Sequence, residues 1–227
     1  MMRIFWLGLC WCVLAGMAQA AEWEVASHEP GLTIYTRAVP GQDLKDFRGV
    51  LRVQASMREV VAALMDVETM PQWFFNMKEA RLLDDGKGNN LVYFVIKGIW
   101  PVSDRDAVIS MSVQQNPQTL ALSMQGTAMP ASYPLMRERV RIPRMKSGWV
   151  VTPVSLHETE VRLDGNADPG GHIPLWIANL VVVSMPKNTL RNLRTLLQKQ
   201  PYSTSNLSQE PRLLKQLARV KYPELVP

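Results

Sequence analysis

Hydrophobic and polar residues alternate along several short segments of this chain, which is the pattern of half-buried β-strands. Residues two apart in a strand share a face, so each segment has one apolar and one polar face. Turn-forming residues such as Pro40-Gly41 and Asn116-Pro117 separate the segments. The expected strands are Leu32–Arg37, Asp46–Gln54, Ala80–Leu83, Leu91–Lys97, Asp106–Gln115, Thr119–Thr127, Leu135–Ile142, Gly148–Leu156 and Thr159–Ala167.

Helical signals occur at four places along the chain. Ser56, with Glu59 three residues later, forms a capping box that predicts the start of a helix. The longest helical pattern begins at Pro174, which suits a first helical position, and contains Pro186, which predicts a kink or a break. The expected helices are 56–65, Met70–Met77, Pro174–Lys199 and Arg212–Val220.

These elements predict an α+β fold in which the long C-terminal helix covers an antiparallel sheet. A sheet with one consistently apolar face must bury that face. Two interpretations stay open, a core filled by side chains or a hydrophobic cavity between sheet and helix. Methionines, which adapt to varied apolar shapes, favour the cavity. The apolar candidates for its wall are Trp73, Val92, Phe94, Ile96, Ile109, Met111, Val113, Leu120, Leu122, Met124, Val161, Leu163, Trp176, Leu180 and Val183.

Three polar residues are candidates for fixing a polar group inside such a cavity, because a buried polar group needs a partner. Glu138 alternates with Met136 and Val140 and is therefore expected to point inward. Thr152 and Asn179 are similar candidates. The alternative for each is a residue that faces solvent or has a structural partner.

Residues 1–20 have the pattern of a secretory signal peptide. Arg3 supplies the positive start, Ile4–Met17 the apolar stretch and Ala18-Gln19-Ala20 the cleavage site. The apolar stretch is too short to cross a bilayer, although an uncleaved anchor helix is the alternative. Both cysteines, Cys10 and Cys12, lie inside this segment. We expect it to be removed, leaving a periplasmic or secreted protein without thiols.

The basic excess of the chain is mild, with a formal net charge of +5 at pH 7. It is dispersed, which argues against a nucleic-acid site and favours transient contact with an anionic membrane surface or another acidic partner. The alternative is a soluble surface with an ordinary charge balance. His28, His157 and His172 have no metal-ligand spacing, and the sequence contains no nucleophile elbow or phosphate-binding loop. We therefore expect no metal, no cofactor and no catalytic residue.

An ordered set of short motifs resembles the START (steroidogenic acute regulatory protein-related lipid transfer) domain family. The resemblance extends from Trp23 to Leu197, and its most specific part is the Asp-Pro-Gly-Gly stretch before the long helix. The motifs are Trp23, Gly31-Leu32-Thr33-Ile34-Tyr35, Phe47-Arg48-Gly49, Trp73, Pro101-Val102-Ser103-Asp104-Arg105-Asp106, Arg141, Gly148, Pro153 and Asp168-Pro169-Gly170-Gly171-His172-Ile173-Pro174.

The resemblance implies a helix-grip fold, in which a curved antiparallel sheet wraps round the C-terminal helix and encloses a hydrophobic, lipid-sized tunnel. It implies binding and transfer of a lipid or another hydrophobic small molecule without catalysis, and we expect a monomer. Val92 and Met111 depart from those members that carry an acid–base pair at these positions, so the ligand does not follow from them. The implied gate of the tunnel, acting with the helix, is the loop Thr127–Pro134 with Met129, Pro130 and Tyr133.

Two other functions stay open. A polyketide cyclase or aromatase would use the same cavity and would need a general acid or base, for which Glu138 is the one candidate. An envelope interaction protein would use Arg212–Val220 as a docking helix. The expected organisation is a signal peptide at 1–20, a lipid-binding domain at 21–200, and a polar linker with a short amphipathic segment at 201–227.

Overall fold

The computed structural model describes residues 21–42, 44–84, 86, 90–199, 202, 215 and 217–223. The predicted signal peptide therefore lies outside the described residues. The elements within these ranges are β1 (Glu24–Glu29), β2 (Leu32–Arg37), β3 (Asp46–Val53), α1 (Met57–Met65), η1 (Val67–Thr69), α2 (Met70–Trp73), β4 (Met77–Leu83), β5 (Leu91–Ile96), β6 (Arg105–Gln115), β7 (Leu122–Ala128), η2 (Pro130–Ser132), β8 (Val140–Arg141), β9 (Arg144–Pro153), β10 (Thr159–Asp168) and α3 (Leu175–Lys199).

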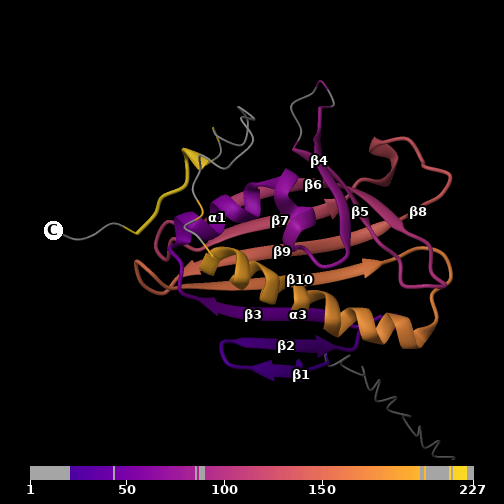
Figure 1. Cartoon of the computed structure of the whole chain (residues 1–227), viewed down its shortest axis with the longest axis horizontal. Helices are drawn as coiled ribbons and strands as arrows, with labels where there is room; N and C mark the ends of the chain where they lie inside the picture. The colour runs from indigo at the N-terminus through magenta and orange to yellow at the C-terminus, as the bar shows by residue number, and fades with distance from the viewer. Residues whose placement is uncertain are drawn as a thin grey trace, which may run out of the picture.

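All strands of the described residues belong to one curved sheet, and α1 and α3 lie on the same face of it (Figure 1). The strand order is β1-β2-β3-β10-β9-β7-β6-β5-β4, and β8 runs parallel beside β6. α3 lies across β2 and β3, and α1 packs beside it against β9. This arrangement confirms the predicted α+β helix-grip fold.

The capping box predicted at the start of α1 is confirmed. The Ser56 hydroxyl accepts a hydrogen bond from the backbone N–H of Glu59 at 3.3 Å, and the Glu59 carboxylate accepts from the backbone N–H of Ser56 at 2.8 Å. Two of the N–H groups that a helix start leaves without partners are thereby satisfied. The apolar face of α1 is buried in the main core.

α3 approaches the sheet closely where it crosses β3. A Cβ atom added to Gly49 would lie 2.4 Å from Leu190 Cδ1, so a larger residue here would require the buried Leu190 side chain to move. The helix runs without interruption from Leu175 to Lys199. Of the two outcomes expected at Pro186, the break is therefore wrong, because this buried proline lies within one continuous helix, whereas the kink stays a prediction.

Two strand predictions need correction at their boundaries. Leu135–Ile142, expected as a strand, contains only the two residues of β8, and the segment before it is an exposed turn. β7 begins at Leu122 because Leu120 has a φ of +59° and belongs to the preceding turn. The side-chain carbonyl of Asn116 closes that turn by accepting hydrogen bonds from two backbone N–H groups.

Two further elements differ from the prediction. β1 was not expected, because Glu24–Glu29 does not alternate, yet it pairs with β2 as an edge strand. The short helix expected over Met70–Met77 ends at Trp73, and Met77 already belongs to β4.

The described part of the C-terminal segment packs against the domain. Leu217 is buried in the main core, the Arg58 guanidinium lies 4.1 Å from the centre of the Tyr222 ring, and the Gln115 side chain accepts from the backbone N–H of Lys221 at 2.9 Å. The linker and most of the helix predicted at 201–227 lie outside the described residues. Leu217 is buried, and the docking role of Arg212–Val220 stays a prediction. Among described helices, none has the length and hydropathy needed to cross a membrane.

Candidate ligand-binding cavity

A cavity of about 290 Å³ lies between the sheet and the helices. Its wall is formed by inward-facing residues of β3, β4, β5, β6, β7, β9 and β10, together with parts of α1, α2 and α3, and is almost entirely apolar. The volume is near the lower end of the range for small-molecule sites, about 300–1,000 Å³. The interpretation as a completely filled core is therefore wrong.

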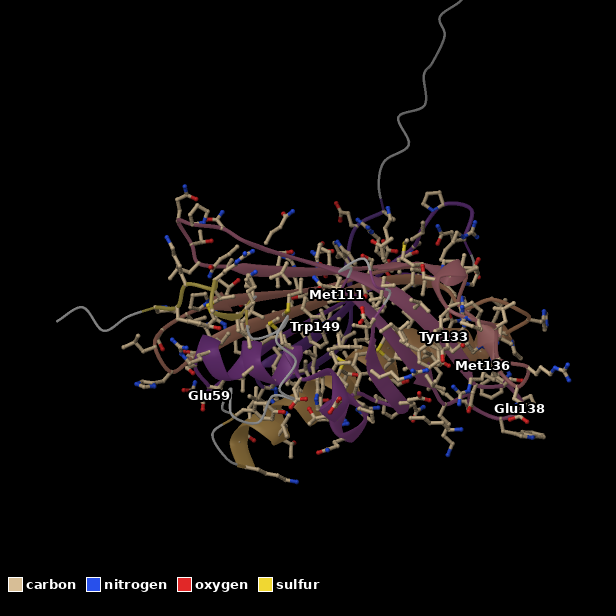
Figure 2. All side chains as sticks on the ribbon, turned by 90° about the horizontal axis from the view of Figure 1, so that it is seen from above. Glu59, Met111, Tyr133, Met136, Glu138 and Trp149 are labelled. Atoms are coloured by element: carbon tan, nitrogen blue, oxygen red, sulfur yellow. The ribbon has the colours of Figure 1, made fainter. Side chains whose placement is uncertain are left out.

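Strand alternation places many of the predicted residues on the wall. Val92 and Phe94 face the cavity, whereas Tyr93 between them packs on the opposite face of the sheet. Figure 2 shows Met111 and Trp149 in the interior of the molecule. Their role in binding a ligand stays a prediction. The predicted residues that line the cavity are Val92, Phe94, Ile96, Ile109, Met111, Val113, Met124 and Leu163.

Other predicted wall residues are buried but lie behind the wall. Trp73 packs against Phe74 and Trp149, with ring-centroid distances of 5.9 and 6.1 Å, and both of those residues line the cavity. Leu122 and Val161 lie in the main core. Val183 is partly buried against the same core. Alternation predicts which face of a strand is buried, but it does not predict which residues on that face line the cavity and which are packed against other side chains.

Leu120 and Thr152 were predicted to face the cavity, and both predictions are wrong. Leu120 lies in the turn before β7. Thr152 lies on β9 between Val151, which is in the core, and Pro153, so its side chain points to the opposite face. It is half-buried there and pairs in register with Glu160.

The N-terminal half of α3 faces the cavity with a stripe that the sequence did not reveal. Ile177, Val181 and Met185 line the wall at intervals of four residues, which is the period of one helix face. Trp176, Asn179 and Leu180 were predicted to line the cavity, but they are exposed on the other side of the helix. This half of the helix is apolar nearly all round, so its sequence does not indicate which side is buried.

The polar candidate on the loop after β7 also faces solvent. Glu138 is exposed in the turn before β8, and Figure 2 shows it at one end of the molecule beside Met136, away from Met111. The expectation that Glu138 points inward is wrong because the strand that would have oriented it is absent from this segment. The cyclase interpretation therefore loses its candidate acid or base.

The predicted gate loop lies against the outer face of the sheet. None of residues 127–134 lines the cavity. Tyr133 packs on Tyr93 with ring centroids 4.9 Å apart, and its hydroxyl accepts a hydrogen bond from Arg81 at 2.6 Å. Met129 is exposed, and the Pro130 carbonyl accepts from Arg141 at 2.5 Å. The predicted position of Met129, Pro130 and Tyr133 at the cavity mouth is therefore wrong in this conformation.

The cavity wall also contains residues that sequence reasoning missed. Phe47 on β3 alternates with Gly49, so the strand pattern could have identified it. The contribution of the short helices depends on how the chain turns between α1 and β4, which no local pattern specifies. The missed apolar residues on the wall include Phe47, Leu64, Met65, Val67, Met70, Phe74, Met145 and Trp149.

One buried charged side chain, that of Arg105, lies on this apolar wall, and the described residues of the wall include no aspartate, glutamate or histidine. Desolvation lowers the pKa of the Arg105 guanidinium. Lys97 and Lys146 also border the cavity, but both are exposed, and strand alternation points their side chains to the opposite face.

Comparison with known proteins identifies the family. The sequence model of the START domain matches residues 12–203. The chain belongs to the START domain family. A solved STAR-related lipid transfer protein fragment from Xanthomonas axonopodis is 34% identical with a TM-score of 0.70, and the match covers 78% of this START protein and 98% of the fragment.

More distant relatives agree with this assignment. An uncharacterised protein of Pseudomonas aeruginosa is 32% identical over 187 residues, which are 82% of this chain and 92% of the relative. The human phosphatidylcholine transfer protein is 25% identical over 184 residues, 76% of this chain and 82% of its own. The structure of human StAR-related lipid transfer protein 5 has a TM-score of 0.68 at 16% identity. The START fold and its apolar cavity support binding of a hydrophobic ligand.

Large apolar side chains are exposed next to the cavity wall of this START protein. Trp100 is 88% exposed and directly follows Ile99, a wall residue. Trp176, 61% exposed, directly precedes the wall residue Ile177 on α3. Leu175 and Leu180 are exposed on the same helix. Exposed apolar side chains at such a place are typical of surfaces that contact a membrane or another apolar partner.

Proposed function

We propose that this START protein holds one lipid molecule in its cavity and transfers it between membranes without chemical change. The observation that carries the proposal is the apolar cavity between α3 and the sheet. Removing an acyl chain of about sixteen carbons from an apolar environment into water costs on the order of 12 kcal/mol. A dry cavity provides an environment equivalent to the bilayer, so a lipid can cross the aqueous space inside the protein.

We propose that the N-terminal half of α3 and the segment Lys97–Val102 form the entrance. Both supply wall residues, and both expose a tryptophan, Trp100 and Trp176, next to those residues. Insertion of these side chains into a bilayer would bring the cavity to the membrane surface. The mildly basic chain would favour anionic membranes.

A variant that fills the cavity tests the binding proposal. Met111→Trp adds a large ring to the wall, whereas Met136→Trp makes the same exchange at an exposed position at the end of the molecule. We expect native mass spectrometry of protein purified from its own host to detect bound lipid in the wild type and the Met136 variant. The Met111 variant should be lipid-free and inactive in transfer between vesicles. Equal lipid loading of all three proteins would contradict binding in this cavity.

The proposed entrance is tested by measuring the rate of lipid transfer between vesicles, because an entrance affects this rate rather than the affinity for lipid. A Trp100→Ser, Trp176→Ser double variant should transfer lipid between vesicles more slowly while binding lipid delivered from solution as the wild type does. Val154→Ser, at an exposed position in the turn between β9 and β10, is the matched control and should transfer at the wild-type rate. An unchanged rate in the double variant would remove these side chains from the mechanism.

We propose that the protein acts in the periplasm or outside the cell after removal of residues 1–20. The support is the pattern from Arg3 to Ala20. Fractionation of the host and N-terminal sequencing of the recovered protein test this point. A mature protein that begins at Ala21 is expected, and a cytosolic protein that begins at Met1 would refute it.

A further inference from the structure

Arg105 faces the cavity from the first position of β6. It shares the inward face of that strand with Ile109 and Met111, and it is only 7% exposed. Its Nη1 donates to the Ser103 carbonyl at 2.5 Å, and its Nη2 donates weakly to the Gly170 carbonyl at 3.4 Å. Nε is buried and has no partner among the described residues.

Other arginines of the same sheet show what the Nε and Nη2 edge of a guanidinium ordinarily binds. Arg141 donates from Nε and Nη2 to the two carboxylate oxygens of Asp106, both at 2.9 Å. Arg48 donates from Nε to Asp164 at 2.7 Å and from Nη2 to the second oxygen at 3.5 Å. The corresponding edge of Arg105 has a backbone carbonyl as its single weak partner and no carboxylate. Its charge is therefore not neutralised by the described protein.

A structural role for Arg105 accounts for only part of these observations. The two carbonyls that it binds, from Ser103 and Gly170, tie the start of β6 to the glycine turn before α3. Neutral carbonyls do not cancel a full charge, and an unpaired buried charge is costly. An asparagine or glutamine could have supplied N–H donors without that cost. The retained charge indicates a partner that arrives from the cavity.

No acidic side chain on the described wall offsets the charge of Arg105. Lys97 and Lys146 border the cavity, but both are exposed, and strand alternation points their side chains to the opposite face of the sheet. Because Arg105 is the buried charge on this wall, a cation or a zwitterion's positive end is disfavoured there.

We propose that the ligand of this START protein is an amphiphile with an anionic headgroup, a carboxylate or a phosphate, and that Arg105 binds this headgroup. The inference rests on the proposed function, because it specifies the class of lipid that the cavity accepts. An oxygen of the headgroup replaces the weak Gly170 contact and bonds to the Nε and Nη2 edge, as carboxylates do at Arg141 and Arg48. The chain then follows Ile109 and Met111 along the inward face of β6.

Competition against a neutral dye tests the proposal separately from lipid binding itself. N-phenyl-1-naphthylamine, an uncharged probe of apolar cavities, reports whether the cavity binds hydrophobic molecules at all. Oleate, 1-oleoyl lysophosphatidate and oleyl alcohol share one chain and differ in the headgroup. We expect the wild type to prefer one or both anions over the alcohol by about 10- to 100-fold, the range of a charge-assisted hydrogen bond.

Variants of Arg105 assign the preference to this side chain. Arg105→Gln should keep dye binding and lose most of the preference, and Arg105→Lys should retain part of it. Arg144→Gln, which removes a charge from an 83% exposed side chain on β9, is the matched control and should behave as the wild type. Preference for only one of the two anions supports the proposal and identifies the headgroup.

Three outcomes would overturn the proposal or its basis. A wild type that binds oleyl alcohol as tightly as both anions would refute the anionic ligand, even if no Arg105 variant folds. An Arg105→Gln variant that keeps the full preference for the anions would show that a cation other than Arg105 binds the headgroup. Failure of the wild type to bind the dye and every oleyl compound would instead contradict the proposed function itself.

Discussion

The buried ion pair between Asp106 and Arg141 is predicted to stabilise the outer face of this START domain, and a substitution of Asp106 tests this prediction. The side chains of Asp106 and Arg141 are 1% and 8% exposed, and they share two hydrogen bonds of 2.9 Å. This contact raises the pKa of the Arg141 guanidinium. Asp106 also accepts a hydrogen bond from the Tyr93 hydroxyl at 3.2 Å. Asp106→Asn keeps the size of the side chain and removes its charge.

The expected cost of Asp106→Asn follows from the burial of the guanidinium that loses its partner. Breaking a buried pair by removing one charge costs about 3–5 kcal/mol, because the other charge stays buried. For a domain of this size, 1 kcal/mol shifts the melting temperature by about 2–4 °C, so the variant should melt about 6–20 °C lower. Urea denaturation measures the free energy of unfolding directly.

Glu160→Gln is the matched control for this experiment. Glu160 pairs with Arg52 at 3.4 Å on the exposed face of the sheet, and exposed pairs contribute about 0–1 kcal/mol. If Asp106→Asn lowers the free energy of unfolding no more than this control does, the reasoning is refuted, because the Arg141 charge would then already be well solvated. In that case the other contacts of Arg141, and not its ion pair, would hold the loop.

The same pair also determines whether the loop after β7 is fixed. Arg141 donates to the carbonyls of Pro130, Tyr133 and Pro134, at 2.5, 2.9 and 2.9 Å. Weakening the arginine should release this loop, which contains the exposed Arg137. Limited trypsin digestion should therefore cut after Arg137 faster in Asp106→Asn than in Glu160→Gln. Equal cutting rates would show that the loop is held by other contacts.

Two further predictions concern other contacts of the fold. Hydrogen bonds from Arg191 and Lys187 lower the pKa of Glu29 to about 2. The stabilisation from Glu29 is therefore present above its unfolded pKa and is lost as the pH falls from about 4.3 towards 2. The urea midpoints of wild type and Glu29→Gln should differ at pH 6 and converge at pH 2. Gly98→Ala would place a Cβ atom 2.0 Å from the Val102 carbonyl oxygen, and we expect it to lower the free energy of unfolding by about 2–3 kcal/mol in urea denaturation. Gly86→Ala meets no atom within 4 Å, but Gly86 has a φ of +67°, so this variant should lose only about 1 kcal/mol, the cost of a left-handed backbone.

Local patterns predicted the elements of this fold wherever the periodicity was strong. The capping box at Ser56 and the alternation in β5 and β6 led to the correct elements. The strand expected over Leu135–Ile142 failed although Arg139 and Arg141 alternate with Val140 and Ile142, because the segment before β8 is an exposed turn. Arg139 and Arg141 instead bind Tyr93 and Asp106 on the outer face of the sheet. β1 was missed because this largely exposed edge strand has no apolar alternation to detect.

The cavity was predictable where a strand has a single buried face and not where an element is apolar all round. Ile109 and Met111 were placed correctly by period-two alternation. On α3, Trp176 and Leu180 are as hydrophobic as Ile177 and Val181, so only the packed structure distinguishes the exposed side from the cavity side. Glu138 was misplaced because its orientation depended on a strand that does not form.

Two consecutive residues of β6 are each involved with a buried positive charge: Asp106 pairs with Arg141, and Arg105 is itself a buried cation. Asp106 points outward and neutralises Arg141 within the protein, which ties the outer loop to the sheet. Arg105 points inward, where the described wall offers only carbonyl partners, and the proposed headgroup would supply the neutralising charge. Because a shift of one residue exchanges the two faces of a strand, the pairing of Arg105 with Ile96 determines both outcomes. The register of β6 therefore places Asp106 against Arg141 on the outer face and Arg105 on the cavity wall.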